Sequence, residues 1–234
     1  MQYLKIGIKP YNEVLELQRC LHKARVEKGI CDTVVFCEHP PVFTLGKRDC
    51  GEDIISDSSA IKKDGIEVIK TDRGGRITYH GPGQLVAYFI FDIVALGKGV
   101  KDFVNMVEEA CLKTLARFGI TAERDEKYPG LWIAGKKIAA LGFHVSGGVT
   151  MHGIALNVAP NLSHYRHIIP CGIRERGITS MKEILRNAPP MEEVIEAFCQ
   201  ALDDSTDENV RRFSSSLNAF KASAFLKSSG RDFR

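Results

Sequence analysis

Apolar side chains recur every three or four residues in three parts of this chain, the spacing expected of helices that bury one face. The first stretch predicts a helix that is capped by Asn12 and ends near Gly29, and its apolar positions are Val14, Leu17, Leu21 and Ala24. The second stops at Gly119 and carries Val104, Val107, Cys111, Leu115 and Phe118. The third follows Pro189 and Pro190, and its positions are Met191, Val194, Ile195, Phe198 and Leu202. Thr179 or Ser180 is expected to cap a shorter helix before it.

Short runs of β-branched and aromatic residues predict strands between these helices. Residues 33–38 (TVVFCE) and 42–45 (VFTL) are expected to be two strands joined by a turn at His39-Pro40-Pro41, and residues 67–70 (EVIK) a third. Residues 85–93 (LVAYFIFDI) are typical of a central strand buried on both faces. Residues 131–145 predict two strands that turn at Gly135-Lys136, and residues 149–158 predict another. The pattern indicates an α/β fold.

The end of the chain has a different composition. Past Asp203 the sequence turns polar, and residues 205–218 carry few side chains that a core would bury, although residues 219–226 (AFKASAFL) are compatible with one last docked turn. We therefore expect a catalytic-size domain over residues 1–204 and a polar C-terminal extension over residues 205–234.

Charge and cysteine content exclude several classes of protein. The 32 Lys and Arg residues against 29 Asp and Glu leave a net charge of +3, which is too small for general binding to nucleic acid, although a local patch remains compatible with an acidic protein partner. Seven cysteines without a C-x-x-C pair fit neither a disulfide framework nor a zinc ribbon. Neither a signal-peptide core nor an apolar run of about 18 residues is visible. We expect a cytoplasmic protein that does not enter the membrane.

The run RGGRITYHGPGQL, residues 73–85, places four glycines and a proline around a polar cluster, between predicted strands. Exposed backbone N–H groups beside an arginine can bind an anion, which suggests a phosphate site. The run lacks the G-K-[ST] of a Walker loop and the strand-to-helix setting of a dinucleotide fingerprint. A tight bend that allows close backbone packing explains the glycines equally well.

Cys171, in the run HIIPCGI, lies between a proline that fixes the backbone and a glycine that removes bulk, which would present an accessible thiol. Buried structural cysteine is the more common case. Lys137 begins an apolar strand, where an ammonium group leaning over a pocket would favour the thiolate and relay protons. His80, His144 or His152 paired with Cys171, as in thiol proteases, is a rival arrangement. A metal site formed by His152, His164 and His167 lacks a fourth ligand at a recognisable spacing.

Four blocks in order, RGGRITYHGPGQLVAY, GKKIAALGFHV, TMHGIALNV and IIPCGI, resemble the lipoyl(octanoyl) transferases of the biotin and lipoate protein ligase superfamily. The resemblance covers residues 38–180 and implies an α/β catalytic domain with a mixed β-sheet flanked by helices. It implies Cys171 as nucleophile and Lys137 as the residue that activates it. Arg76 departs from the family pattern, which often has an acidic or amide residue at that position. The implied substrate contacts are Arg73, Gly74, Gly75, Arg76, Ile77, Thr78, Tyr79, His80, Ala140, Leu141, Gly142, Gly153, Ile154 and Ala155.

The resemblance further implies transfer of an octanoyl group from octanoyl-acyl carrier protein to one lysine of a lipoyl domain, through a thioester on the enzyme. The implied acceptors are the lipoyl domains of 2-oxoacid dehydrogenases and the glycine cleavage H protein. Because the acyl group arrives as a thioester, neither metal nor nucleotide cofactor is expected. Two alternatives stay open: an ATP-dependent lipoate or biotin ligase on the same fold, and a lipoyl-domain binding module without activity.

Overall fold

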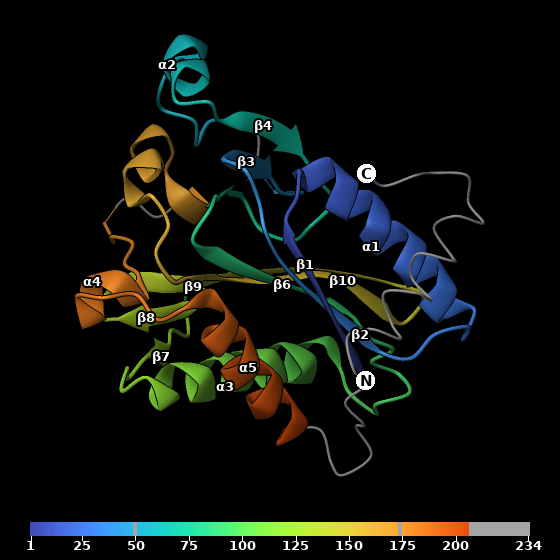
Figure 1. The fold of residues 1–234 in the computed structure, drawn as a ribbon. Helices are drawn as coiled ribbons and strands as arrows, with labels where there is room; N and C mark the ends of the chain where they lie inside the picture. The colour runs from blue at the N-terminus through green and yellow to red at the C-terminus, as the bar shows by residue number, and fades with distance from the viewer. Residues whose placement is uncertain (49–50, 173–174, 206–234) are drawn as a thin grey trace.

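The computed structural model describes residues 1–48, 51–172 and 175–205, and the side chain of Cys171 lies outside the described part. Within these residues, helices and strands alternate along the chain (Figure 1). The helices are α1 (Tyr11–Val26), α2 (Ser58–Lys63), α3 (Val100–Arg117), α4 (Met181–Leu185) and α5 (Met191–Asp203), with the 3-10 turns η1 (Leu162–His167) and η2 (Pro170–Gly172). The strands are β1 (Gln2–Ile8), β2 (Thr33–Glu38), β3 (Val42–Leu45), β4 (Glu67–Lys70), β5 (Ile77–His80), β6 (Gln84–Ile90), β7 (Glu123–Arg124), β8 (Leu131–Ile133), β9 (Lys136–Ser146) and β10 (Val149–Asn157).

A seven-stranded sheet in the order β1-β2-β6-β10-β9-β8-β7 forms the centre of the molecule. The β1 and β2 strands pair in parallel and the other neighbours pair antiparallel, so the sheet is mixed, as expected. Helix α1 covers one face, and α3 and α5 cover the other (Figure 1). The β6 strand is buried along its whole length, because both faces of the sheet carry helices.

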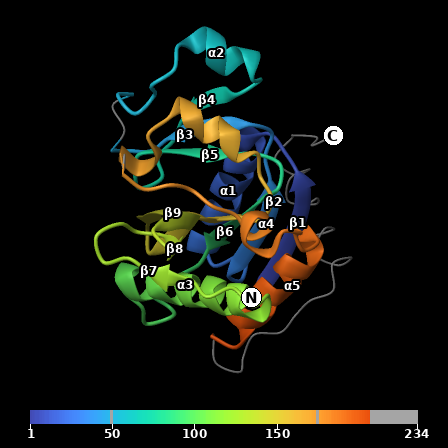
Figure 2. The ribbon, with the colours of Figure 1, turned by 90° about the vertical axis from the view of Figure 1, so that its left-hand side faces the viewer.

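A three-stranded sheet in the order β4-β3-β5 lies on the same side of the large sheet as α1, with α2 beyond it (Figure 2). It has its own apolar cluster, formed by Phe43, Ile61, Ile66, Ile77, Tyr79 and Ile168. The other face of β5 looks toward the large sheet. The space between β5 and the strands β6, β9 and β10 contains the cavities described below.

Most predicted elements are confirmed. Strands β2, β3 and β4 have the predicted bounds, and Ser180 caps α4 by accepting a hydrogen bond from the Glu183 backbone N–H. The turn between β8 and β9 is present but lies at Ala134 and Gly135, one residue before the predicted position, because Lys136 is already the first residue of β9. Helix α3 ends two residues before Gly119. The predicted C-terminal extension, including residues 219–226, lies outside the described residues except for Ser205.

Three local predictions are wrong. Asn12 does not cap α1, because Pro10, with φ at −53°, is at the N-cap and the helix begins at Tyr11, one residue before Asn12. The strands before and after His39 are present as predicted, and they belong to different sheets, since β2 joins the large sheet and β3 the small one. The glycine-rich run does not lie between strands but contains β5. The central strand β6 ends at Ile90, three residues before the predicted end.

Candidate active site

Lys137 lies near the start of β9 and is 5% exposed. Its Nζ donates to the Pro129 carbonyl oxygen at 3.0 Å and lies 4.8 Å from the centre of the Trp132 ring. Gly130, with φ at +131°, makes room for this side chain, since a Cβ there would lie 3.1 Å from the lysine Cε. A buried ammonium group held by a carbonyl and an aromatic face is an ordered charge, in contrast to a solvated surface lysine.

The backbone on both sides of Lys137 is paired as well. The Lys137 N–H donates to the Gly177 carbonyl at 2.9 Å, and its own carbonyl accepts from the Thr179 N–H at 3.0 Å. The segment just after η2 is therefore attached to the start of β9. The neighbouring Lys136 is exposed, as its position in the predicted turn suggested.

Position 171 lies in the middle of η2, which packs beside β5. The turn is closed by the Gly172 N–H, which donates to the Ile169 carbonyl at 3.0 Å. Pro170 and Lys137 line the same cavity of about 250 Å³. The η2 turn, which carries the predicted nucleophile, and Lys137, the predicted activating residue, therefore border the same cavity.

A second cavity, of about 460 Å³, continues from the first, because Thr78, Ala140 and Ala155 line both. It runs between β5 and the large sheet toward α1. Of the 14 predicted substrate-contact residues, 11 line it: Arg73, Gly75, Arg76, Thr78, His80, Ala140, Leu141, Gly142, Gly153, Ile154 and Ala155.

Alternation along β5 decides which residues of the glycine-rich run reach this cavity. Thr78 and His80 face it, whereas Ile77 and Tyr79 point to the opposite side and pack in the apolar cluster of the small sheet. The Tyr79 hydroxyl shares a 2.9 Å hydrogen bond with His164 Nδ1. Ile77 and Tyr79 therefore form the support of the strand, and the strand's other face forms the cavity wall.

The two predicted triplets on β9 and β10 are cross-strand neighbours. Gly142 pairs with Gly153, Leu141 with Ile154, and Ala140 with Ala155. Small side chains at both ends of the triplets keep the space above the sheet open. At Gly153 a Cβ would collide with the Ala87 carbonyl oxygen of β6, so this position also requires the missing side chain for strand packing.

Arg73 and Gly74 attach the glycine-rich run to its neighbours. The Arg73 guanidinium, 7% exposed, donates from Nε to Thr44 Oγ1 at 3.0 Å and from Nη1 to the Gly74 carbonyl at 3.0 Å. The Gly74 N–H donates to the Phe143 carbonyl of β9 at 3.0 Å, and a Cβ at position 74 would lie 2.9 Å from that oxygen. Gly74 is thus a packing residue that brings the loop against the sheet.

The end of the cavity away from Lys137 is closed by Tyr11, His80, Tyr88 and His152. Burial lowers the pKa of His80 to about 3, with His39 and Arg73 adding to the effect. His80 Nδ1 lies 2.7 Å from Gln84 Oε1. A neutral, hydrogen-bonded imidazole closes a cavity without placing a charge in it.

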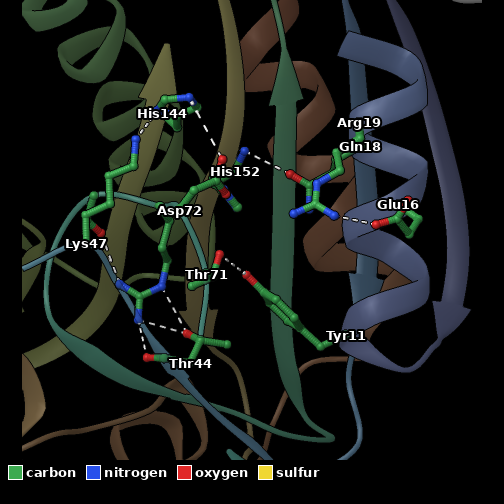
Figure 3. Close-up of polar contacts among 12 residues, drawn as sticks. Tyr11, Glu16, Gln18, Arg19, Thr44, Lys47, Thr71, Asp72, His144 and His152 are labelled. Carbon is green, nitrogen blue, oxygen red and sulfur yellow. Dashed lines mark hydrogen bonds and ion pairs between the residues drawn. The ribbon is translucent and has the colours of Figure 1, made fainter. Parts of the chain in front are cut away.

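His152 connects this closed end to α1 and to the loop before β5 (Figure 3). Its Nε2 lies 2.8 Å from Asp72 Oδ1, and its backbone N–H donates to Gln18 Oε1 at 2.9 Å. Asp72 also lies 3.9 Å from His144, whose Nδ1 lies 3.0 Å from Lys47 Nζ. The φ of His152 is +62°, a conformation that costs energy in a residue with a side chain and that its contacts hold in place.

The rival readings of the histidines find little support in this geometry. His80, His144 and His152 do not line the cavity beside Pro170. His152, His164 and His167 each have a separate partner, namely Asp72, Tyr79 and Asp64. Among residues 1–48, 51–172 and 175–205, no three His, Cys, Asp or Glu side chains are grouped as a metal site would require.

Sequence reasoning missed several residues that position this site. Gln84 donates to Asn157 Oδ1 at 2.9 Å, and Asn157 donates to the Thr179 carbonyl at 3.0 Å, which links His80 to the backbone next to Lys137. Polar residues in otherwise apolar strands were the available signal, since Gln84 and Asn157 stand at strand ends and are buried. Pro129, Trp132 and Asp53 carried no such signal.

Comparisons with known proteins place the chain in a family. The sequence profile of the lipoyl protein ligase A/B catalytic domain matches residues 10–203. The chain belongs to the lipoyl protein ligase A/B catalytic-domain family. An octanoyltransferase of Caldicellulosiruptor saccharolyticus is 44% identical over 187 residues, 79% of this chain and 80% of that protein. An octanoyltransferase of Chloroflexus aggregans is 43% identical over 200 residues, 84% of this chain and 90% of that protein.

Solved structures of a lipoate-protein ligase and of a biotin protein ligase share the fold. A lipoate-protein ligase A bound with ATP superimposes with a TM-score of 0.68 at 17% identity, covering 99% of this chain and 96% of that one. A biotin protein ligase from Aquifex aeolicus, in complex with biotin and ATP, gives a TM-score of 0.53 at 16% identity, covering 97% and 74%. The expected family and fold are confirmed. Both of the relatives named above are octanoyltransferases, so the expectation of an acyltransferase that moves octanoyl groups in lipoylation is confirmed as well.

Within the described residues, no helix is both long enough and apolar enough to cross a bilayer. The longest, α3, carries a charged face with Lys101, Asp102 and Glu109.

Proposed function

We propose that the enzyme transfers the octanoyl group through a thioester on Cys171, with Lys137 moving the protons. The observation that supports this most is the shared cavity of Lys137 and Pro170, which opens into the larger cavity between β5 and the sheet. The smaller cavity would then contain the nucleophile and the proton carrier, and the larger cavity next to it would hold the acyl chain. The Lys137 Nζ is held in place by the Pro129 carbonyl and the Trp132 ring, and not by solvent.

In the first half-reaction, the Cys171 thiolate, paired with the Lys137 ammonium group, attacks the carbonyl carbon of the carrier thioester. The new carbon–sulfur bond forms as the bond to the phosphopantetheine sulfur breaks, and Lys137 gives a proton to that departing sulfur. A cation about 4 Å from the thiolate contributes roughly 4 kcal/mol at an effective dielectric constant near 20. Desolvation reduces this gain, yet it remains large enough to shift the thiol toward its reactive form.

In the second half-reaction, the amine of the acceptor lysine attacks the Cys171 thioester. Lys137, neutral at this stage, removes the proton that the amine loses, and the cysteine leaves as a thiolate. The acyl amide is the product, and the enzyme returns to its starting state without external energy. Backbone N–H donors would stabilise the tetrahedral oxyanion by roughly 3 to 4 kcal/mol each. The Gly172 N–H already donates within the η2 turn, so this donor must come from another group.

The octanoyl chain is proposed to lie along β10 in the cavity of about 460 Å³. Its walls include Val86, Leu141 and Ala155, and the buried ring ends of Tyr11, His80 and Tyr88 close it. Burying an eight-carbon chain contributes on the order of 5 kcal/mol at about 0.8 kcal/mol per methylene. A closed end supplies the length selection that burial alone does not, because one methylene changes affinity only a few-fold.

The proposal also covers the acyl donor, the acceptor proteins, the cellular compartment and the bounds of the catalytic domain. Octanoyl-acyl carrier protein is the proposed donor, and lipoyl domains of 2-oxoacid dehydrogenases and the glycine cleavage H protein are the proposed acceptors. One structural relative is described as part of an archaeal lipoylation system with its E2 lipoyl domain. We place the enzyme in the cytoplasm, consistent with free thiols at Cys20, Cys31, Cys37, Cys111 and Cys199. The catalytic domain is proposed to span residues 1–204, since the family profile and α5 both end at residue 203.

Incubation with octanoyl-acyl carrier protein, followed by mass spectrometry of the intact protein, tests the proposal. One octanoyl group should appear on the peptide containing residue 171 and should be released by hydroxylamine. Cys171→Ser should lower the rate of octanoyl transfer to a lipoyl domain by at least about a thousandfold. Cys31→Ser, which changes an exposed thiol on the loop before β2, is the matched control and should keep full activity. Transfer that persists in Cys171→Ala and requires ATP would establish a ligase instead.

A further inference from the structure

Arg76 lies immediately before β5, and its side chain pairs with a buried carboxylate. Its Nε lies 2.6 Å from Asp53 Oδ2 and its Nη2 lies 3.0 Å from Asp53 Oδ1, a two-point pairing of planar groups. The Asp53 side chain is 6% exposed, whereas that of Arg76 is 37% exposed. A carboxylate this deeply buried depends on its partner, because losing the guanidinium would leave an uncompensated charge.

The backbone of the Asp53 segment is joined to the chain leading into η2. The Asp53 carbonyl accepts from the Ile169 N–H at 2.8 Å, and the Ile55 N–H donates to the His167 carbonyl at 2.9 Å. Ile54 and Ile168 form an antiparallel bridge between these contacts. Asp53 is therefore fixed to the residue that stands two positions before Cys171.

The same guanidinium touches the chain just after Cys171. Gly172 has φ at +71°, and a Cβ there would lie 3.3 Å from Arg76 Cζ and Nε. Arg76 also lines the larger cavity. One side chain thus contacts the cavity, the turn after position 171 and, through Asp53, the strand-like segment before it.

We propose that Arg76 and Asp53 are positioning residues, whose paired side chains hold the η2 turn of Cys171 against the cavity. This rests on the proposed function, since it takes Cys171 as the nucleophile. Among the described residues, the charged groups near the turn include Arg76 from the start of β5, its partner Asp53, and Lys137 from β9 across the smaller cavity. The Asp53–Arg76 pair fixes where the turn lies, and the guanidinium adds positive charge next to it.

The rate of Cys171 alkylation by iodoacetamide, followed by peptide mass spectrometry, measures the position and ionisation of this thiol without any acyl substrate. Arg76→Gln and Asp53→Asn should each lower that rate, and the kcat of octanoyl transfer, by between about tenfold and a hundredfold, as displacement of a reacting group does. KM should change little. Arg76→Gln should also move the midpoint of the alkylation pH profile upward, which a purely structural role would not do. The double variant should be no slower than the slower single variant, since the pair acts as one unit.

Arg124→Gln is the matched control, because Arg124 pairs with Glu108 at 3.0 Å and the two side chains are 40% and 8% exposed, much like the Asp53–Arg76 pair. It should leave Cys171 alkylation unchanged. If Arg76→Gln does not fold, Arg76→Lys, which keeps the charge but loses the two-point contact, should fold and still show the slower alkylation. Wild-type alkylation rates in Arg76→Gln or Arg76→Lys, or an equal loss in Arg124→Gln, would overturn the proposal. Wild-type protein that transfers no octanoyl group, while its alkylation still depends on Arg76, would refute the proposed function and leave the positioning role standing.

Discussion

The two ends of the cavity are lined by side chains of different chemistry. Near Lys137 the structure brings an ammonium group, an aromatic face and the η2 turn together, whereas at the other end the imidazole of His80 and the phenols of Tyr11 and Tyr88 are buried and hydrogen-bonded. Burial raises the pKa of both tyrosines and lowers that of His80, so these three side chains are neutral near pH 7.

The difference follows from what each end has to do in the proposed reaction. Proton transfer needs a group that can be charged and neutral in turn, and such a group needs ordered partners that tolerate both states. An alkyl chain needs walls that neither titrate nor attract water, because a charge beside a methyl group would have to be solvated. The same small sheet supplies both ends, through Thr78 near the catalytic end and His80 near the closed end.

Removing the charge at the catalytic end is expected to have the largest effect. Lys137→Ala should lower the rate of octanoyl transfer by about a hundredfold to ten-thousandfold, because a general acid–base group is lost. Single-turnover kinetics with octanoyl-acyl carrier protein measure this. Lys136→Ala changes the adjacent, exposed lysine and should cost less than about twofold. Equal losses in both variants would mean that Lys137 acts through the strand and not through its ammonium group.

The next largest effect is expected from lowering the pH, which should reduce the stability of the fold through the buried histidines. Burial lowers the pKa of His80 to about 3 and that of His39 to about 4, both below the ordinary value near 6.5. Between pH 6.5 and these lowered pKa values, the histidines bind protons in the unfolded chain but not in the native one. The free energy of unfolding therefore falls as the pH drops below about 6.5. Each histidine contributes at most about 1.4 kcal/mol per pH unit.

Urea unfolding at a series of pH values checks this. In His39→Gln the slope between pH 6 and 5 should be smaller than that of the wild type by up to about 1.4 kcal/mol per pH unit, provided the variant keeps its fold at pH 7. The depressed pKa of Asp64, caused first by its hydrogen bond to His167, affects stability only at lower pH, where the carboxylate itself takes up a proton. A slope that is identical in wild type and variant would show that His39 is accessible to protons in the native state.

The smallest effect is expected from the aromatic support of the catalytic lysine. Trp132→Phe keeps a ring under Nζ but removes the N–H that donates to the Tyr128 carbonyl at 2.9 Å, and a phenyl ring attracts a cation less strongly than an indole. Transfer should slow by about two- to fivefold, with unchanged Cys171 alkylation. A loss as large as that of Lys137→Ala would assign Trp132 a direct part in substrate binding.

Much of the element order was predictable because each element carries its own periodic signal. The β2, β3 and β4 strands have their predicted bounds, and the three long helices appear where the three- and four-residue spacing indicated. The glycine-rich run, the two triplets and Lys137 were also identified, and the cavity lining includes most of them. Helix starts such as Pro10 and strand ends such as Ile90 were placed less well, since termini depend on local caps and on what the chain packs against.

The sequence by itself determined the residue types that line the cavity, because spacing and composition act over a few residues, and its four motif blocks carried the resemblance to the family. Only the tertiary structure decided that β2 and β3 join different sheets, that Ile77 and Tyr79 face away from the cavity, and that Asp53 meets Arg76 beside the η2 turn. These outcomes depend on contacts between segments far apart in the chain. Which face of a strand is buried, and which carboxylate meets which guanidinium, follows from how the two sheets pack together and is not recorded in either segment alone.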